Sequence, residues 1–145
     1  MRLLVALVAC LATPIANAWD TPRKAIDEFL KFELGGGRLQ SWPFTKYLAV
    51  PPDYDEPGWD EVELIEEAKV LTLSCSETRC QFPVEFTFTA TRGKNLQQVT
   101  EHPNGGKQTL TYVAVKTKGQ WLIESSNGLP RVSYKAYKKL YPNGL

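Results

Sequence analysis

A strict alternation over Cys80–Arg92 limits the fold of this chain more than any other feature. Successive side chains of an extended strand point to opposite faces, so every second residue lies on one face. The alternation therefore predicts a strand with one face on a core and the other toward water. The apolar face is Cys80, Phe82, Val84, Phe86, Phe88 and Ala90, and the opposite face is Gln81, Pro83, Glu85, Thr87, Thr89 and Thr91.

Three further stretches have a period of two. Val62–Cys75 predicts a long strand, bent near Glu66. Gln108–Lys118 and Gln120–Ser126 predict two strands joined by a tight turn. The segment Gly93–Lys107 is polar and rich in turn residues, so it predicts a loop or a wide hairpin connection. The second half of the chain therefore supplies at least four consecutive strands.

The segment before these strands has a helical period instead. Thr21 is suited to the N-cap of a helix and Pro22 to its first position. Gly35-Gly36-Gly37 ends the helix, because glycine adopts the left-handed conformation that follows many helices. The side chains that share one helical face are Ala25, Ile26, Phe29, Leu30, Phe32 and Glu33.

Shorter helical stretches complete the expected fold. Arg38–Trp42 and Pro43–Leu48 each predict about one turn, because Pro43 cannot lie inside a longer helix. Ser133–Tyr141 predicts a last short helix. Helices followed by consecutive strands are typical of the α+β class. We therefore expect N-terminal helices packed on a curved, mainly antiparallel sheet of four or more strands.

The N-terminus has the pattern of a secretory signal peptide. Arg2 supplies a positive charge, Leu3–Ala12 is apolar, and Ala16-Asn17-Ala18 is a small-x-small cleavage site before Trp19. The apolar run is shorter than the ~20 residues that span a bilayer. Residues 1–18 are therefore expected to be removed, leaving a single domain over residues 19–145 that is periplasmic or secreted. An alternative is a lipoprotein with its lipid on Cys10.

The charge balance argues against one class of partner. The chain has 17 Lys and Arg residues against 16 Asp and Glu residues, and loss of the signal peptide removes only Arg2 from this count. The mature chain is then close to neutral. Proteins that bind nucleic acids need a basic surplus to displace the counterions of the phosphates, so a nucleic-acid partner is not expected.

Two cysteines remain in the mature chain, Cys75 and Cys80. An even number in an oxidising compartment indicates a disulfide, which here would close a short hairpin. The alternatives are a redox dithiol and a metal site. Redox dithiols usually lie two residues apart at a helix N-terminus, and a metal would lack two further ligands. We expect no metal and no cofactor.

The order of these elements resembles the nuclear transport factor 2-like superfamily, also called cystatin-like or SnoaL-like, whose members form a cone. The resemblance is carried by Ala25–Leu34, Trp59–Val70, Cys80–Gly93 and the Gly-x-Trp-x-Ile pattern of Gly119–Ile123. It implies a curved sheet around the first helix. Enzymes of this superfamily, such as ketosteroid isomerases and scytalone dehydratases, place acids, Tyr or His inside the cone. No such set aligns with this sequence residue by residue, and a shared fold does not fix the chemistry.

Two carboxylates are the candidate catalytic residues, Glu33 and Glu66. Glu33 shares a helical face with Phe29, so its side chain either points into the cone, where burial would raise its pKa, or reaches water at the edge of that face. His102 lies in a polar loop, where a general base is rarely shielded from water. A catalytic role for His102 is therefore not expected.

Charged and aromatic residues provide other possible binding surfaces. Acids gather between Asp53 and Glu67, which predicts a solvated acidic rim rather than a calcium loop. Basic residues gather near the C-terminus, at Arg131, Lys135, Lys138 and Lys139. The aromatic side chains either line a pocket for an apolar ligand or fill the core; they are Trp42, Tyr47, Phe86, Phe88, Tyr112 and Trp121.

These observations favour a non-catalytic exported protein that binds a protein partner or a small apolar ligand. An accessory role in envelope assembly and immunity against an exported toxin both belong to this hypothesis. The alternative is a small cone-fold enzyme that uses pocket carboxylates for proton transfer, as an isomerase or dehydratase does. A carboxylate with a strongly perturbed pKa in a closed pocket would distinguish the enzyme. The sequence leaves the oligomeric state open.

Overall fold

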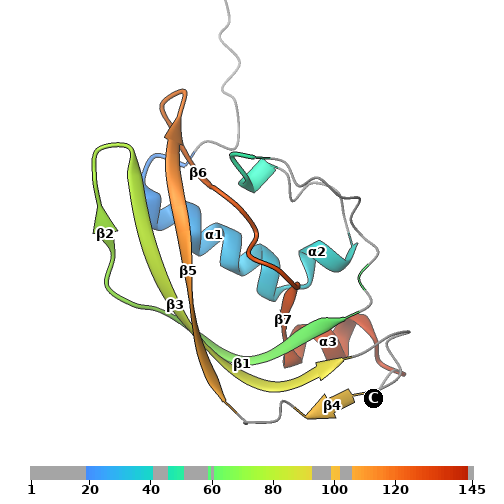
Figure 1. Ribbon diagram of the computed structural model, residues 1–145. Helices are drawn as coiled ribbons and strands as arrows, with labels where there is room; N and C mark the ends of the chain where they lie inside the picture. The colour runs from blue at the N-terminus through green and yellow to red at the C-terminus, as the bar shows by residue number, and fades with distance from the viewer. Residues whose placement is uncertain are drawn as a thin grey trace, which may run out of the picture.

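The computed structural model describes residues 19–40, 46–50, 59, 61–92, 99–101 and 106–143 (Figure 1). Within these residues the chain is α+β, with an N-terminal helix packed on a strongly curled mixed sheet that forms a half-barrel. The fold class expected from the sequence is therefore confirmed. The proposed signal peptide, Trp42, His102 and the acids Asp53, Asp55, Glu56 and Asp60 lie outside the described residues.

The first helix, α1, spans Pro22–Leu34 and begins as its sequence predicts. The Thr21 hydroxyl accepts a hydrogen bond from the Lys24 amide at 3.3 Å, and Pro22 occupies the first turn, where a missing amide hydrogen costs nothing. The helix buries Ala25, Ile26, Phe29, Leu30 and Glu33. Its buried face thus includes one carboxylate among apolar side chains.

A close approach at Gly36 links the end of α1 to the C-terminal helix. Gly36 has φ of 83°, and α2, Gly37–Gln40, follows it directly. A Cβ at Gly36 would overlap the Leu140 side chain, whereas a Cβ at Gly119, with φ of 82°, would meet no atom within 4 Å.

We expect Gly36→Ala to lower the free energy of unfolding by about 1–3 kcal/mol, because left-handed strain and steric overlap add together. Gly119→Ala is the matched control, since it introduces the backbone strain without the overlap. Urea unfolding of both variants measures the difference. If both variants lose the same free energy of unfolding, the steric overlap between residue 36 and Leu140 does not contribute to the loss.

Within the described residues seven strands form one sheet, in the order β6-β5-β3-β1-β7, with β2 and β4 also paired to β3. All pairs are antiparallel except β1 with β7. The strands curl around α1 (Figure 1). Their bounds are β1 Val62–Val70, β2 Ser74–Cys75, β3 Arg79–Arg92, β4 Val99–Glu101, β5 Lys107–Thr117, β6 Gln120–Ile123 and β7 Arg131–Ser133, and the last helix, α3, is Tyr134–Leu140.

The structure departs from the expected elements at three places. The stretch Val62–Cys75 is two strands rather than one, with an interruption at residues 71–73. The segment Gly93–Lys107, expected to be a loop or connection, contains β4. The sequence analysis also missed β7, whose three residues are too few to show a period.

Irregular pairing between β1 and β3 changes which β1 residues face the main core. The register shifts between Leu64 and Ile65 and again between Ile65 and Glu67, so Glu66 has no partner in the ladder. As a result Ile65 packs in the main core, whereas Val62 and Leu64 pack in a second cluster. The shift lies at the bend expected near Glu66.

Two apolar clusters hold these elements together. The main cluster joins α1 to the concave face of the sheet through residues that include Phe29, Phe82 and Phe86. The second cluster places Tyr137 of α3 against Val62, Leu64 and Val132. The buried Arg131 adjoins both clusters, because its guanidinium lies 5.3 Å from the Phe86 ring of the main cluster and Val132 of the second cluster follows it in the chain.

A disulfide joins Cys75 and Cys80, which are directly opposite each other in β2 and β3. The sequence prediction is confirmed for this pair. Their Cα atoms are 4.1 Å apart, and the bond closes a hairpin far from the C-terminal helix (Figure 1).

Removing the bond by Cys75→Ala with Cys80→Ala is expected to lower the free energy of unfolding by about 2 kcal/mol, since the loop is short. Denaturant unfolding of this variant should match that of the reduced natural chain. Rapid alkylation of both thiols in the native, exported protein would contradict the assignment.

Candidate functional site

The residues singled out from the sequence separate into two groups. Glu33 and the described aromatic candidates are buried, at 0% exposure for Glu33 and at most 8% for Tyr47, Phe86, Phe88, Tyr112 and Trp121. Glu66 is exposed, at the irregular position of β1. The described aromatic residues thus belong to the core, and the two candidate acids do not share a site.

Glu33 lies in a buried cluster of charged side chains. Its Oε1 accepts a hydrogen bond from Nη1 of Arg38 at 3.0 Å and another from the backbone amide of Arg131 at 3.3 Å. Nη1 of Arg131 is 4.0 Å from the same oxygen. Oε2 of Glu33 is buried and accepts no hydrogen bond from the described residues. One carboxylate therefore lies between two guanidinium groups.

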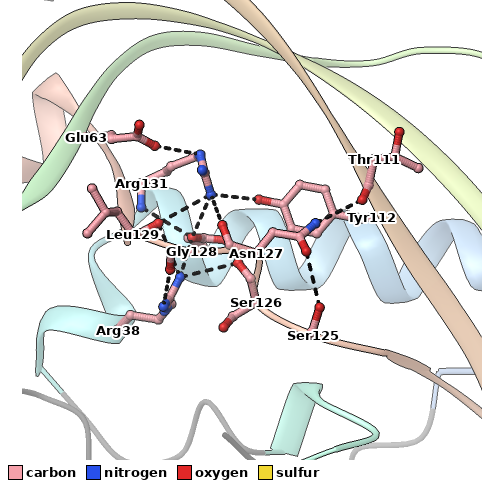
Figure 2. Close-up of polar contacts among 11 residues, drawn as sticks. Arg38, Glu63, Thr111, Tyr112, Ser125, Ser126, Asn127, Gly128, Leu129 and Arg131 are labelled. Atoms are coloured by element: carbon pink, nitrogen blue, oxygen red, sulfur yellow. Dashed lines mark hydrogen bonds and ion pairs between the residues drawn. The ribbon is translucent and has the colours of Figure 1, made fainter. Parts of the chain in front are cut away.

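Arg38, on α2, also binds the loop between β6 and β7 (Figure 2). Its Nη2 donates to the carbonyl oxygen of Gly128 at 2.9 Å, and its Nη1 lies at 3.4 Å from that of Leu129 and 3.5 Å from that of Ser126. The guanidinium is also 4.7 Å from the centre of the Trp59 ring. Arg38 is 1% exposed, so these contacts replace almost all of its hydration.

Arg131, at the start of β7, ties the same loop to the sheet (Figure 2). Its Nη1 donates to the carbonyl oxygen of Asn127 at 2.8 Å and to the Tyr112 hydroxyl at 3.3 Å. Its Nε is 2.9 Å from Oε2 of Glu63, an ion pair whose angle is too poor for a hydrogen bond. The guanidinium also lies 5.3 Å from the Phe86 ring.

The loop residues are shaped to present their carbonyl oxygens to the arginines. Asn127 and Gly128 both have positive φ, 52° and 78°, a conformation that Asn and Gly adopt at low cost. Nδ2 of the Asn127 side chain donates to the Thr111 carbonyl oxygen at 2.9 Å, and Oδ1 of the same side chain accepts from the Ser125 hydroxyl at 3.2 Å (Figure 2). The Asn127 side chain therefore links the turn both to β5 and to the residues that precede the turn.

The charges of the cluster balance formally, because Arg38 and Arg131 oppose Glu33 and Glu63. Burial raises the pKa of the Glu33 carboxyl, and the positive charges of Arg38 and then Arg131 oppose that shift without cancelling it. Burial, reinforced by the Glu33 charge, also raises the pKa of Tyr112. The arrangement is suited to holding α1, α2, β5 and the loop together.

An open cleft of about 390 Å³ lies on the other side of α1. Its volume is within the range of ligand pockets, about 300–1,000 Å³. Gly37 allows the chain to approach the Phe32 ring, since a Cβ there would overlap that ring. The cleft is lined by Glu28, Lys31, Phe32, Gly35, Gly37 and Tyr47.

Stacked aromatic rings form one wall of this cleft. Tyr47 packs between Trp19, at 5.0 Å between ring centres, and Phe32, at 4.6 Å. Nζ of Lys46 lies 4.9 Å from the Tyr47 ring. The wall is thus aromatic and packed, and the charged side chains of Glu28 and Lys31 lie at the cleft.

Comparison with known proteins adds no family to this description. No protein-family model matches the sequence, and no curated protein has significant similarity to it. Within the part of the chain that the structure describes, no helix has the length and hydropathy of a membrane span. No group of three or more potential metal ligands occurs in those residues either.

Sequence reasoning missed most of the cluster around Glu33. Arg131 was assigned to a basic surface, and Glu63 was counted with the acidic rim. Arg38 was not singled out at all. One usable signal was Glu33 itself, an acid on an apolar helical face, which requires a buried cation as a partner.

Proposed function

We propose that this chain is an exported, non-catalytic binding protein whose partner is another protein. An accessory role in an envelope assembly and immunity against an exported toxin are both consistent with such a function. The observation that carries the proposal is the environment of Glu33. This carboxylate is bonded to Arg38 and to the Arg131 amide, so it is engaged in holding the fold.

A catalytic base needs to reach a proton of its substrate, at about 2.6–3.2 Å or through one water. Glu33 is fully buried, and it does not line the cleft beside α1. The aromatic side chains of the cone pack against one another, as Phe86 does against Tyr112. These contacts favour a filled core over an internal pocket for an apolar ligand.

The cleft beside α1 is the surface that we assign to the partner. Its aromatic wall and adjacent charges resemble the composition of protein interfaces, in which aromatic anchors are surrounded by polar groups. Phe32, whose side chain is half-buried and is supported by Tyr47, would contact an apolar side chain of the partner, and Glu28 and Lys31 would contact polar groups around it.

Export is the second part of the proposal. The disulfide between Cys75 and Cys80 is compatible with an oxidising compartment. Trp19, the expected first residue after cleavage, is 7% exposed, and its carbonyl oxygen accepts a hydrogen bond from the Trp121 amide at 3.0 Å. Cleavage after Ala18 would therefore keep this anchor within the mature chain.

Site-specific photo-crosslinking in the producing cells tests the partner surface. A photoreactive residue at Lys31 is expected to give one discrete protein adduct. The same residue at Lys118, on the exposed turn between β5 and β6, is the matched control and should give none. An absence of adducts from Lys31, or equal adducts from both positions, would contradict the assignment.

The enzyme remains the alternative, because burial raises the pKa of Glu33 and its Oε2 has no hydrogen bond from the described residues. Carboxyl titration by NMR distinguishes the two functions. If a small substrate analogue shifts the Glu33 carboxyl resonance directly, the proton-transfer enzyme is favoured. If Glu33 responds only to global unfolding, the structural role is supported.

A further inference from the structure

One edge of the sheet is only partly covered. The parallel strand β7 pairs with Glu63–Ile65 of β1, and β3 lies along the other side of β1. Among the described residues, no strand pairs with the remaining edge of β1, from Glu66 to Val70. Uncovered edges of this kind are templates for pairing with another strand.

The backbone of β1 shows which groups this edge presents. The Leu71 amide donates to the Pro83 carbonyl at 2.8 Å, so the hydrogen-bonding groups of Leu71 point toward β3. Because the direction alternates along a strand, those of Glu67 and Lys69 also point toward β3. The amide and carbonyl groups of Ala68 and Val70 therefore point outward, away from the sheet.

Two exposed charges flank Ala68 on the outer face of this edge. Glu67 and Lys69 are both exposed. Lys69 lies opposite Glu85 in the ladder, but Glu85 pairs with Lys107 at 2.9 Å. Neither Glu67 nor Lys69 has an ion pair within the described part of the chain. Lys107 interacts electrostatically with Glu67 but forms its ion pair with Glu85, so a positive and a negative charge, two residues apart, can still contact a partner.

We propose that this edge pairs antiparallel with the same edge of a second copy of the chain, about a twofold axis at Ala68. In this register Ala68 lies opposite Ala68 of the second copy, and their outward amide and carbonyl groups form a reciprocal hydrogen-bonded pair. Glu67 of each copy then lies opposite Lys69 of the other. The twofold axis therefore creates two pairs of opposite charges across the interface.

The side chains beneath the edge support the same register. Ala68 and Val70 pack against the main core but are only half-buried, so a second strand would cover more of their apolar surface. The pairing is short and buries little area, so the dimer is expected to be weak and to depend on concentration and salt.

Charge reversal tests the register directly. Glu67→Lys and Lys69→Glu each place like charges opposite one another twice, and each should raise the dissociation constant of the dimer about tenfold or more. An equimolar mixture of these two variants has only opposite charges across the interface. The mixture is therefore expected to form a heterodimer, although neither variant dimerises well alone.

Sedimentation equilibrium of the mature chain and its variants provides the measurement. Lys135→Glu and Glu77→Lys, at exposed positions elsewhere, are the matched controls and should dimerise as the natural chain does. A natural chain that stays monomeric at high protein concentration would overturn the proposal. So would a dimer that Glu67→Lys leaves unchanged, or a mixture that fails to associate.

Amide hydrogen exchange gives a second, residue-level readout. The Ala68 amide should exchange slowly in concentrated protein and rapidly on dilution, because only the second copy protects it. The Lys69 amide, which points toward β3, should be protected at both concentrations. Concentration-independent exchange at Ala68 in a sample that sediments as a dimer would place the interface elsewhere and overturn the proposal.

Discussion

Arg38→Met is expected to lower the free energy of unfolding at neutral pH by about 3–5 kcal/mol, the usual cost of removing one partner from a buried ion pair. The substitution keeps the apolar volume of the side chain but removes the donors to Glu33 and Gly128. Chemical denaturation at neutral pH measures the effect. Lys135→Met, which removes an exposed cation on α3, is the control and should change little.

The loss should depend on pH in a defined direction. Burial already raises the pKa of Glu33 in the folded chain, and removal of the Arg38 charge would raise it further. A raised carboxyl pKa means that the folded state binds the proton more tightly than the unfolded state. The stabilisation that comes from protonated Glu33 is then complete below the pKa of this carboxyl in the unfolded chain. It is lost as the pH rises through the higher pKa in the folded chain.

Arg38→Met should therefore approach the natural chain in stability at acid pH and fall behind it as the pH rises. The double variant Glu33→Gln with Arg38→Met has no carboxyl to titrate, so this difference in pH dependence should disappear. A loss in Arg38→Met that stays constant from acid to neutral pH would show that Glu33 is not the titrating partner.

Phe86→Ala is expected to lower the free energy of unfolding by about 3–5 kcal/mol, as large-to-small changes in a packed core do. Phe86 is fully buried, and its ring lies 6.4 Å from that of Phe88 and 6.3 Å from that of Tyr112. The Arg131 guanidinium also lies over this ring, so the loss removes support from the charged cluster.

Urea unfolding of Phe86→Ala, read from both the midpoint and the slope, measures this cost. Tyr134→Ala removes another aromatic side chain, one that is 37% exposed, and serves as the control for truncation at the surface. A loss for Phe86→Ala as small as that for Tyr134→Ala would mean that the cone is an open pocket at this point. The proposed function would then have to include an internal ligand.

Local patterns were sufficient to predict the architecture. The period of two at Phe82–Phe88 and the capped helix starting at Pro22 depend on neighbours in sequence, and both are present in the structure. The buried face of the helix and the disulfide between Cys75 and Cys80 followed from the same local information. Residue types and their spacing were therefore enough to predict the fold class.

The charged cluster could not be predicted in this way, because its partners are distant in sequence. Glu63 lies just before the irregular pairing that determines which β1 residues face the main core, and a periodic pattern does not reveal such a shift. Arginine is usually found at the protein surface. Arg38 and Arg131 are buried here because carbonyl oxygens of the loop replace their hydration. The described aromatic residues, expected either to line a pocket or to fill the core, are buried in the core, and local patterns did not bring the charged residues of the cluster together.

The long separation between partners has a kinetic consequence. Glu33 and the Arg131 amide that binds it are 98 residues apart, and Arg38 binds Gly128 across 90 residues. Closing such long loops is slow, and these two loops cannot close before Gly128 and Arg131 have been synthesised. Arg38 follows Glu33 by five residues, but the Arg131 amide that also binds Glu33 is added to the chain much later. The contacts that hold α1 and α2 to the loop between β6 and β7 are therefore among those that form late in synthesis.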